Sequence, residues 1–174
     1  MKNKIFIAID TKNINRARKI IAQSKLNNFK IGYKFGLEFF NSKYGRKFIS
    51  KMRSEIVFID LKLHDIPNTM SSALISLKDL KINYLTVHIS SGLKALREVK
   101  KVSGKIKIVG VTTLTSLDTQ DLKSLGYKKP LSEMVKQQSK LAQKANLDGI
   151  VCSPHEVKLV KKFFSKEIIT PGIR

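Results

Sequence analysis

Short apolar runs of strand length alternate with amphipathic segments along the chain, and this alternation restricts the possible folds more than any other feature. The first run, Ile5–Ile9, is continuously apolar, as is typical of a parallel strand that is covered on both faces. Residues 14–25 then place apolar side chains, among them Ile14, Ala17 and Ile21, at a helical spacing. Strands and helices that alternate with short connections predict parallel βα units.

The alternation continues to residue 170 and predicts seven strands with six helices between them. We expect the strands at residues 5–9, 29–33, 56–60, 84–89, 106–112, 148–152 and 168–170. We expect the helices at residues 14–25, 36–52, 67–80, 91–101, 131–145 and 155–164, with a shorter segment at 117–125.

Such a series forms either a doubly wound sheet or a (β/α)8 barrel. A glycine-rich dinucleotide-binding turn after the first strand is missing, which counts against the doubly wound sheet. Polar side chains near the strand ends favour the barrel, because barrels gather their active-site residues at the C-terminal ends of the strands. These side chains are Asp10, Lys30, Asp60, Lys62, His88, Thr115 and Arg174. We therefore predict an α/β fold, a TIM (β/α)8-type barrel that is truncated after the seventh strand and forms a single domain over residues 1–174.

The composition fits one globular domain, with 174 residues of which 42% are hydrophobic. No apolar run reaches the length of a membrane span, and the N-terminus lacks the long apolar segment and cleavage site of a signal peptide. The single cysteine, Cys152, excludes an internal disulfide and lies in an apolar run, so we expect it to be a small buried side chain and not a nucleophile. These features predict a cytoplasmic protein without a membrane partner.

The formal net charge of +21 is compatible with binding to nucleic acid, to an anionic surface or to an anionic substrate. The lysines are spread over nearly every predicted helix, no basic run is interleaved with aromatic residues, and tryptophan is absent. The charge alone therefore identifies no partner, and we do not expect nucleic acid to be one.

Three charges follow directly on the third apolar run, at Asp60, Lys62 and Asp65. A strand alternates its side chains between two faces, so we expect Asp60 and Lys62 to point the same way. Charges in this arrangement at the end of a buried strand favour a functional site. The alternative is a salt-bridged turn that leads into a helix, with Pro67 near the helix start and Asp65 or Asn68 as its cap.

The same stretch resembles a known family. Its Asp-x-Lys-x-x-Asp pattern, followed by Ile-Pro-x-Thr, is similar to the signature of the orotidine 5′-phosphate decarboxylases, and the whole run from Asp60 to Thr69 matches. Related sugar-phosphate decarboxylases share the short core, whereas the sequence His-Asp-Ile-Pro-Asn-Thr makes the match specific. Five matching segments in the same order extend the resemblance from Asp10 to Arg174. The family is also a barrel, and its last helix-strand-helix portion is missing here, so that this sequence is either a fragment or closes its fold in another way.

The resemblance implies decarboxylation of orotidine 5′-phosphate to UMP, a step of pyrimidine biosynthesis that needs neither metal nor cofactor. The reaction leaves a carbanion at C6 of the pyrimidine, which a fixed cation has to stabilise and then protonate. Lys62 is the expected cation and proton donor, and flanking carboxylates would keep it charged. The resemblance places Asp60 next to the departing carboxylate.

In that family the second aspartate of the motif reaches into the active site of the other subunit of a homodimer. The resemblance therefore implies a homodimer in which Asp65 is shared across the interface, together with Ile66 and Thr69.

Lys30 adds a further charge to this set. It lies inside an apolar strand, where burying an unpaired charge costs free energy, so we expect it to have an acidic partner. We expect Lys30 to face the barrel interior with Asp60 as its partner, whereas Lys34, the competing choice, is expected to be solvated. Asp10 resembles the family's ribose-binding aspartate, and its alternative role is to cap the helix at 14–25.

Two later segments complete the expected substrate site. Thr115, which we prefer over Ser116, resembles the hydroxyl that contacts the pyrimidine amide in the family. The end of the chain resembles the start of the phosphate-gripping loop, with Pro171 and Arg174 as substrate contacts and a charge-assisted bond from the arginine. The three histidines lack a metal-binding spacing, so we assign no metal ligand.

Two other functions stay open at the level of sequence. One is a related barrel decarboxylase or aldolase that acts on a sugar phosphate with Mg²⁺. The other is a truncated, inactive barrel that binds nucleic acid through its charge, with an affinity that falls steeply with salt.

Overall fold

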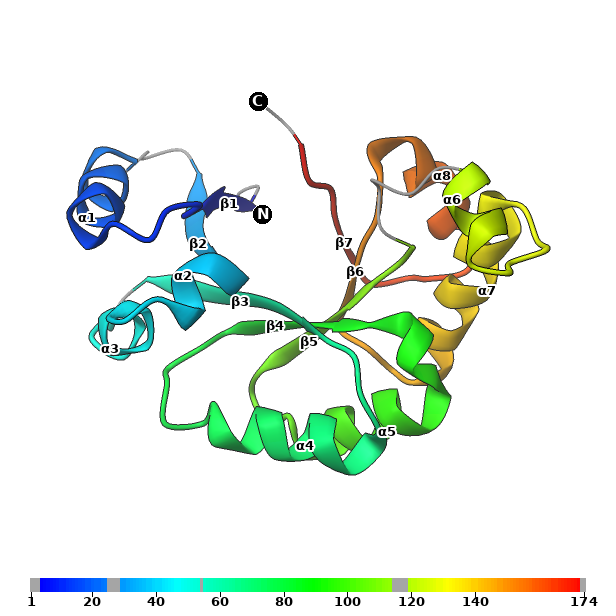
Figure 1. Ribbon diagram of the computed structural model, residues 1–174, viewed down its shortest axis with the longest axis horizontal. Helices are drawn as coiled ribbons and strands as arrows, with labels where there is room; N and C mark the ends of the chain where they lie inside the picture. The colour runs from blue at the N-terminus through cyan, green and yellow to red at the C-terminus, as the bar shows by residue number, and fades with distance from the viewer. Residues whose placement is uncertain (1–3, 25–28, 54, 114–118, 173–174) are drawn as a thin grey trace. The chain divides into compact units, whose positions relative to one another are not determined.

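The computed structural model describes residues 4–24, 29–53, 55–113 and 119–172. Within these ranges it has seven strands, which follow one another in hydrogen-bonding order from β1 to β7 (Figure 1). The chain divides into two compact units, residues 1–61 with 76–85 and residues 62–75 with 86–174. β3 and β4 contribute residues to both units, and the single domain expected over residues 1–174 stays a prediction.

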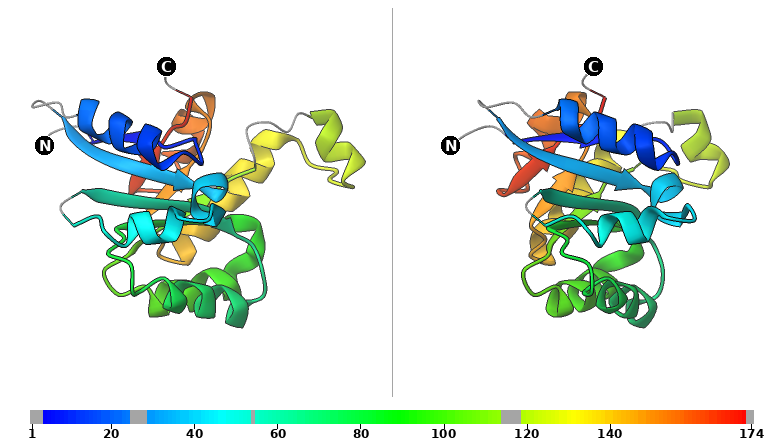
Figure 2. Two further views of the ribbon diagram at one scale, coloured as in Figure 1. Left: turned by 60° about the vertical axis from the view of Figure 1, so that its left-hand side comes forward. Right: turned by 90° about the vertical axis from the view of Figure 1, so that its left-hand side faces the viewer.

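The first unit is built from parallel strands with helical connections. Its elements are β1 (Lys4–Ala8), α1 (Ile14–Gln23), β2 (Lys30–Gly36), α2 (Leu37–Asn41), α3 (Gly45–Ile49), most of β3 (Ile56–Leu63) and the start of β4 (Tyr84–His88). β1 pairs with β2 and β2 with β3, with Ala8 opposite Lys34 and Gly36 opposite Asp60. α1 lies alongside β2 in both views of Figure 2.

Aromatic side chains form much of the core of this unit. Phe6, Phe58 and Tyr84 pack with ring centroids 5.0 to 5.5 Å apart. Gly32 makes room for them, because a Cβ at this position would lie 2.8 Å from the Phe6 ring. A second cluster has centroids 4.9 to 6.3 Å apart, and its members are Phe35, Phe39 and Phe48.

The single helix predicted over residues 36–52 is wrong, because a turn divides it into α2 and α3. The N–H of Gly45 donates to the Ser42 carbonyl at 3.0 Å, and the Ser42 hydroxyl donates to the Phe39 carbonyl at 2.7 Å. A Cβ on Gly45 would lie 1.8 Å from that same Phe39 oxygen. Only glycine lets the backbone at residue 45 approach the Phe39 carbonyl this closely. The turn between α2 and α3 therefore depends on Gly45.

The second unit repeats the strand and helix alternation. Besides the ends of β3 and β4 it contains α4 (Pro67–Ser76, up to residue 75), η1 (Ile89–Ser91), α5 (Gly92–Val102), β5 (Lys107–Val111), α6 (Thr119–Ser124), α7 (Leu131–Lys144), β6 (Gly149–Val151), η2 (Pro154–Glu156), α8 (Val157–Val160) and β7 (Glu167–Ile169). β5 pairs in parallel with β6, and β6 with β7. Figure 2 shows α6 projecting beyond α7, away from these strands.

Apolar side chains and one carboxylate join the elements of the second unit. Its fully buried side chains include Leu96, Val135 and Ile150. Asp148 accepts a hydrogen bond from the Lys100 ammonium at 2.6 Å and another from the Ile108 N–H at 2.8 Å. A single carboxylate thus ties α5 and β5 to the start of β6.

All seven predicted strands are present, but their ends differ from the prediction. β2 runs to residue 36 instead of 33, and β3 runs to residue 63 instead of 60. The helix predicted at 155–164 is reduced to η2 and the single turn of α8. Among the described residues, no helix combines the length and apolar character needed to cross a bilayer.

Candidate active site

An ion pair joins the carboxyl ends of β2 and β3. The Lys34 ammonium lies 3.2 Å from the Asp60 carboxylate, and the two side chains are 26% and 11% exposed. The register explains the contact: Gly36 lies opposite Asp60, and Lys34 lies two residues earlier on the same face, so its long side chain reaches along the strand. Pairing offsets part of the cost of removing both charges from water.

The expectation that Lys30 pairs with Asp60 is wrong. Lys30 is exposed, opens β2 and lies opposite Lys4 at the amino end of the strands. It shares a face with Lys34 but lies four residues, roughly 13 Å, away along the strand. The predicted strand ended too early, at residue 33, which made Lys34 look like a solvated residue of the following loop.

Lys62 has a backbone conformation that is rare inside a strand. Its φ angle is +49°, in the left-handed region that costs an L-residue about 1–2 kcal/mol. Its N–H donates to the hydroxyl of Thr86, which is fully buried on β4, at 2.8 Å. The regular alternation of the strand is therefore interrupted at Lys62, and the expectation that Asp60 and Lys62 point the same way stays a prediction. Thr86 was missed from the sequence, where its only signal is a hydroxyl within an apolar strand.

The residues expected at a subunit interface are exposed in this chain. Asp65, Ile66 and Thr69 all lie at the surface, and the apolar Ile66 side chain is 65% exposed. The Asp65 carboxylate accepts a hydrogen bond from the Ile66 N–H at 2.7 Å, next to the start of α4. The bond goes to the next residue, before α4 begins at Pro67, so the capping role that was the alternative for Asp65 stays a prediction.

Of the other predicted substrate contacts, two can be described. Asp10 is exposed after β1 and does not cap α1, because the Asn13 side chain accepts the Arg16 N–H there at 3.0 Å. Pro171 is exposed after β7. Thr115 and Arg174 lie outside the described residues, and so does Ser116.

The remaining titratable side chains of the described residues can be compared with the requirements of a metal centre. Within the described ranges, no group of three His, Cys, Asp or Glu residues is placed to hold a metal ion. The His64 and His88 rings lie 5.1 Å apart at the ends of β3 and β4. Burial, with the nearby Glu156 carboxylate, raises the pKa of the Cys152 thiol to about 12, which agrees with the predicted inert, buried side chain.

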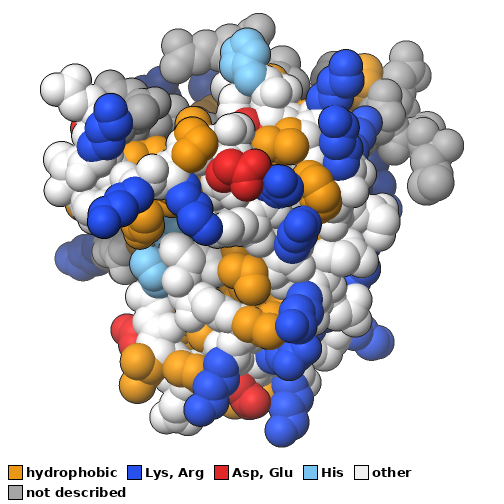
Figure 3. All heavy atoms as spheres, turned by 90° about the vertical axis from the view of Figure 1, so that its right-hand side faces the viewer, with side chains coloured by type: hydrophobic (Ala, Val, Ile, Leu, Met, Phe, Trp, Pro, Cys, Tyr) orange, Lys and Arg blue, Asp and Glu red, His pale blue; other side chains and the backbone are white. Residues whose placement is uncertain are grey.

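On the face drawn in Figure 3, the positive charge is spread over several groups of side chains. Figure 3 shows lysine and arginine side chains in several groups on one face, with hydrophobic and acidic side chains between them. This arrangement agrees with the spread of lysines expected from the sequence.

The sequence of this chain is similar to those of known proteins. The chain is 40% identical to an orotidine 5′-phosphate decarboxylase of Sphingopyxis alaskensis over 178 residues, which cover all of this chain and 78% of that protein. It is 41% identical to the protein of the same name from Wolbachia pipientis, with coverage of 99% and 77%.

Solved structures agree with these sequence relatives. Orotidine 5′-phosphate decarboxylase from Lactobacillus acidophilus has a TM-score of 0.87 and 30% identity, covering 99% of this chain and 82% of that one. The Methanocaldococcus jannaschii enzyme complexed with the inhibitor BMP has a TM-score of 0.80 and 25% identity, with coverage of 100% and 79%.

These likenesses confirm the predicted fold class, an α/β protein of the TIM-barrel type, with seven of its strands in the described part of the chain. The profile of one family, described as orotidine 5′-phosphate decarboxylase / HUMPS, matches residues 3–174. The chain therefore belongs to the orotidine 5′-phosphate decarboxylase / HUMPS family.

Proposed function

We propose that this protein decarboxylates orotidine 5′-phosphate to UMP and CO₂ without a metal or an organic cofactor. The observation that carries the proposal is the ion pair between Lys34 and Asp60 at the carboxyl ends of β2 and β3. Asp60 precedes Lys62, which has a left-handed backbone, by two residues in the sequence. Relatives that are named for this activity match the full chain at about 40% identity, which supports the assignment.

Lys62 is the residue that we assign to the chemical step. Loss of CO₂ breaks the bond between C6 and the carboxylate carbon and leaves the electron pair on C6. The Lys62 ammonium stabilises this carbanion and transfers a proton to it, after which the neutral amine recovers a proton from water. A left-handed backbone persists only where its surroundings hold it, and the bond from the Lys62 N–H to Thr86 supports such a fixed position.

Asp60 and Lys34 act together in this proposal. We assign Asp60 to a position next to the substrate carboxylate, where the repulsion between the two falls as neutral CO₂ forms. The Lys34 ammonium pairs with the Asp60 carboxylate and fixes its direction. Lys34 thus takes the role that the sequence suggested for Lys30.

The substrate contacts are assigned by similarity to the family. Asp10 binds the ribose hydroxyls, and Thr115 binds the pyrimidine amide. Pro171 and Arg174 begin the loop that holds the phosphate, with a charge-assisted bond from the guanidinium.

We further propose a homodimer in which Asp65, Ile66 and Thr69 reach the partner's active site. The high exposure of Ile66 supports an interface at this position. Mixing Lys62→Ala with Asp65→Ala protein tests the arrangement. Random exchange of subunits restores one intact site in each mixed dimer, or about a quarter of the wild-type activity. If Asp65 instead serves its own subunit, no activity returns.

The activity itself is tested by following the loss of orotate absorbance with orotidine 5′-phosphate as substrate and EDTA present. We expect turnover in the unmodified protein and a decrease of at least about 10³-fold in Lys62→Ala, since one group supplies both the electrostatic and the acid contribution. Full activity of a folded Lys62→Ala protein would refute the mechanism. Activity on a sugar phosphate that disappears with EDTA would favour the Mg²⁺-dependent alternative.

A further inference from the structure

A groove runs between α1 and the segment from α3 to the start of β3, entirely within the first unit. Two adjoining hollows of about 430 and 330 Å³ form it, and they share Arg18, Phe48 and Lys51. We call it the α1–α3 groove. Its volume lies in the range of sites that bind small molecules.

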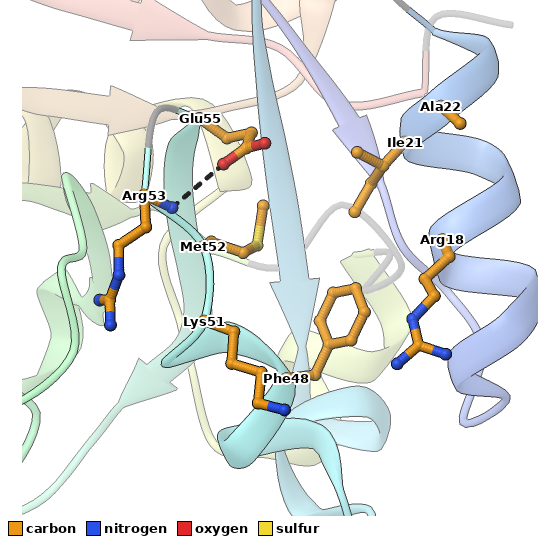
Figure 4. Close-up of a pocket in the computed structure, with 8 residues that line it drawn as sticks. All are labelled: Arg18, Ile21, Ala22, Phe48, Lys51, Met52, Arg53 and Glu55. Atoms are coloured by element: carbon orange, nitrogen blue, oxygen red, sulfur yellow. Dashed lines mark hydrogen bonds between the residues drawn. The ribbon is translucent and has the colours of Figure 1, made fainter.

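The floor of the α1–α3 groove is apolar and held in place by the core. Figure 4 shows Ile21, Phe48 and Met52 directed into the space between the two sides. Phe48 forms the edge of the second aromatic cluster, with its ring centroid 5.4 Å from Phe39 and 6.3 Å from Phe35. The floor is therefore largely formed before any ligand binds, which lowers the entropy cost of binding.

Cations flank this floor on both sides. Arg18 projects from α1 and Lys51 follows α3, on either side of the Phe48 ring (Figure 4). Arg18 donates a hydrogen bond to Asn15 at 3.2 Å, and within the described ranges neither Arg18 nor Lys51 forms an ion pair. The Glu55 carboxylate, at one end of the groove, accepts the Arg53 N–H at 3.2 Å.

The Glu55 end of the groove lies away from the candidate active site. Glu55 precedes β3, whereas Asp60 lies five residues further on, or roughly 17 Å along an extended strand. A second copy seated symmetrically in this groove is a poor occupant, because Arg18 and Lys51 would then face the same cations of the other copy. Charge complementarity instead favours an anion, and the apolar floor requires an apolar body.

We propose that the α1–α3 groove binds a small organic anion with an apolar body, of the class of medium-chain carboxylates. Arg18 and Lys51 hold the carboxylate by charge-assisted hydrogen bonds, and the chain lies over Ile21, Phe48 and Met52. The inference does not depend on the proposed decarboxylation.

Decanoate is the probe, used at concentrations where light scattering shows it to be monomeric. A ligand that binds only the folded state raises the melting temperature in a saturable way. We expect this rise with decanoate and binding at least about tenfold weaker for uncharged decanol. Equal binding of the two compounds, or a decanoate effect only above its aggregation threshold, would overturn the proposal.

Charge-matched variants locate the site. Arg18→Glu/Lys51→Glu should weaken decanoate binding at least about tenfold, whereas Arg16→Glu/Lys19→Glu, with the same charge change on exposed positions of α1 outside the groove, should bind as the wild type does. Equal losses in both variants would show attraction by net charge alone and would overturn the site.

A steric variant tests the floor without opening the core. Ala22 is exposed and lines the groove, so Ala22→Trp should fill it and abolish binding. Gln23→Trp places the same side chain on the neighbouring exposed position and should leave binding intact. Unchanged binding in a folded Ala22→Trp protein would exclude the groove.

Discussion

The Lys34 ammonium lies 3.2 Å from the Asp60 carboxylate, and this contact joins the carboxyl ends of two neighbouring parallel strands. Lys34→Met should remove this ion pair from a mostly buried place, which we expect to lower the free energy of unfolding by about 1–3 kcal/mol and kcat/KM by at least about tenfold. Urea unfolding and the decarboxylation assay measure these effects.

Lys30→Met is the matched control, since it removes the same charge from the same face of β2 at an exposed position. Lys30→Met should change neither the free energy of unfolding nor kcat/KM appreciably. If the Lys30 and Lys34 variants lose activity equally, the Lys34–Asp60 pair is not the determinant.

The left-handed backbone of Lys62 predicts an unusual order of stability among its variants. Lys62→Ala and Lys62→Gly both lose the ammonium and should both be inactive. Glycine adopts a φ of +49° without steric cost, so Lys62→Gly should be more stable than Lys62→Ala by about 1 kcal/mol, opposite to the usual order within a strand. Denaturant unfolding of the two inactive proteins checks this. A more stable alanine variant would contradict the strained conformation.

Thr86 supplies the acceptor for the Lys62 N–H. Thr86→Val keeps the shape but leaves that N–H without this acceptor, at a cost of about 1–3 kcal/mol in the free energy of unfolding. We expect kcat to fall with little change in KM, because the Lys62 backbone would lose its anchor. Thr86→Ser restores the hydroxyl and should recover most of kcat. A serine variant as impaired as the valine variant would assign the loss to packing.

Asp148 should be important for stability in the second unit. It accepts hydrogen bonds from both Lys100 and the Ile108 N–H, so Asp148→Ala leaves two donors without this partner and should cost about 2–4 kcal/mol. Asp79→Ala removes an exposed ion pair with Arg46 and should cost less than about 1 kcal/mol. Thermal or urea unfolding distinguishes the two. Equal costs would contradict this role of Asp148.

The Cys152 thiol should be inert while the protein is folded. Its pKa is raised from 9.0 to about 12 by burial, so almost no thiolate exists at pH 8, and a thiol reagent should label the protein only after unfolding in urea. The folded state holds this proton more tightly than the unfolded state. The thiol therefore contributes stability that is present below pH 9 and lost as the pH rises toward 12.

Comparison of the wild type with Cys152→Ala between pH 9 and 11 isolates this contribution from that of the lysines. The free energy of unfolding should fall more steeply with pH in the wild type. Parallel curves, or rapid labelling of the folded protein, would show that the thiol is accessible.

Much of this protein follows from local sequence. Continuous apolar runs such as Ile56–Ile59 are long enough and apolar enough to be buried strands, and all seven predicted strands are found. The run from Asp60 to Thr69 carries the family signature, because it is a contiguous stretch that can be compared residue by residue. The burial of Cys152 likewise follows from its apolar neighbours.

Tertiary structure alone decided which lysine pairs with Asp60. The period of two in a strand places Lys30 and Lys34 on one face. It does not say which of them lies beside Asp60 on the neighbouring strand. The register between β2 and β3 decides this, and it joins residues more than twenty positions apart in the sequence. Likewise, the φ of Lys62 is held in part by Thr86 on another strand, and the turn at Gly45 depends on how closely two backbone segments approach. Periodicity records which side a residue faces, whereas distances between side chains arise only when separate segments are packed together.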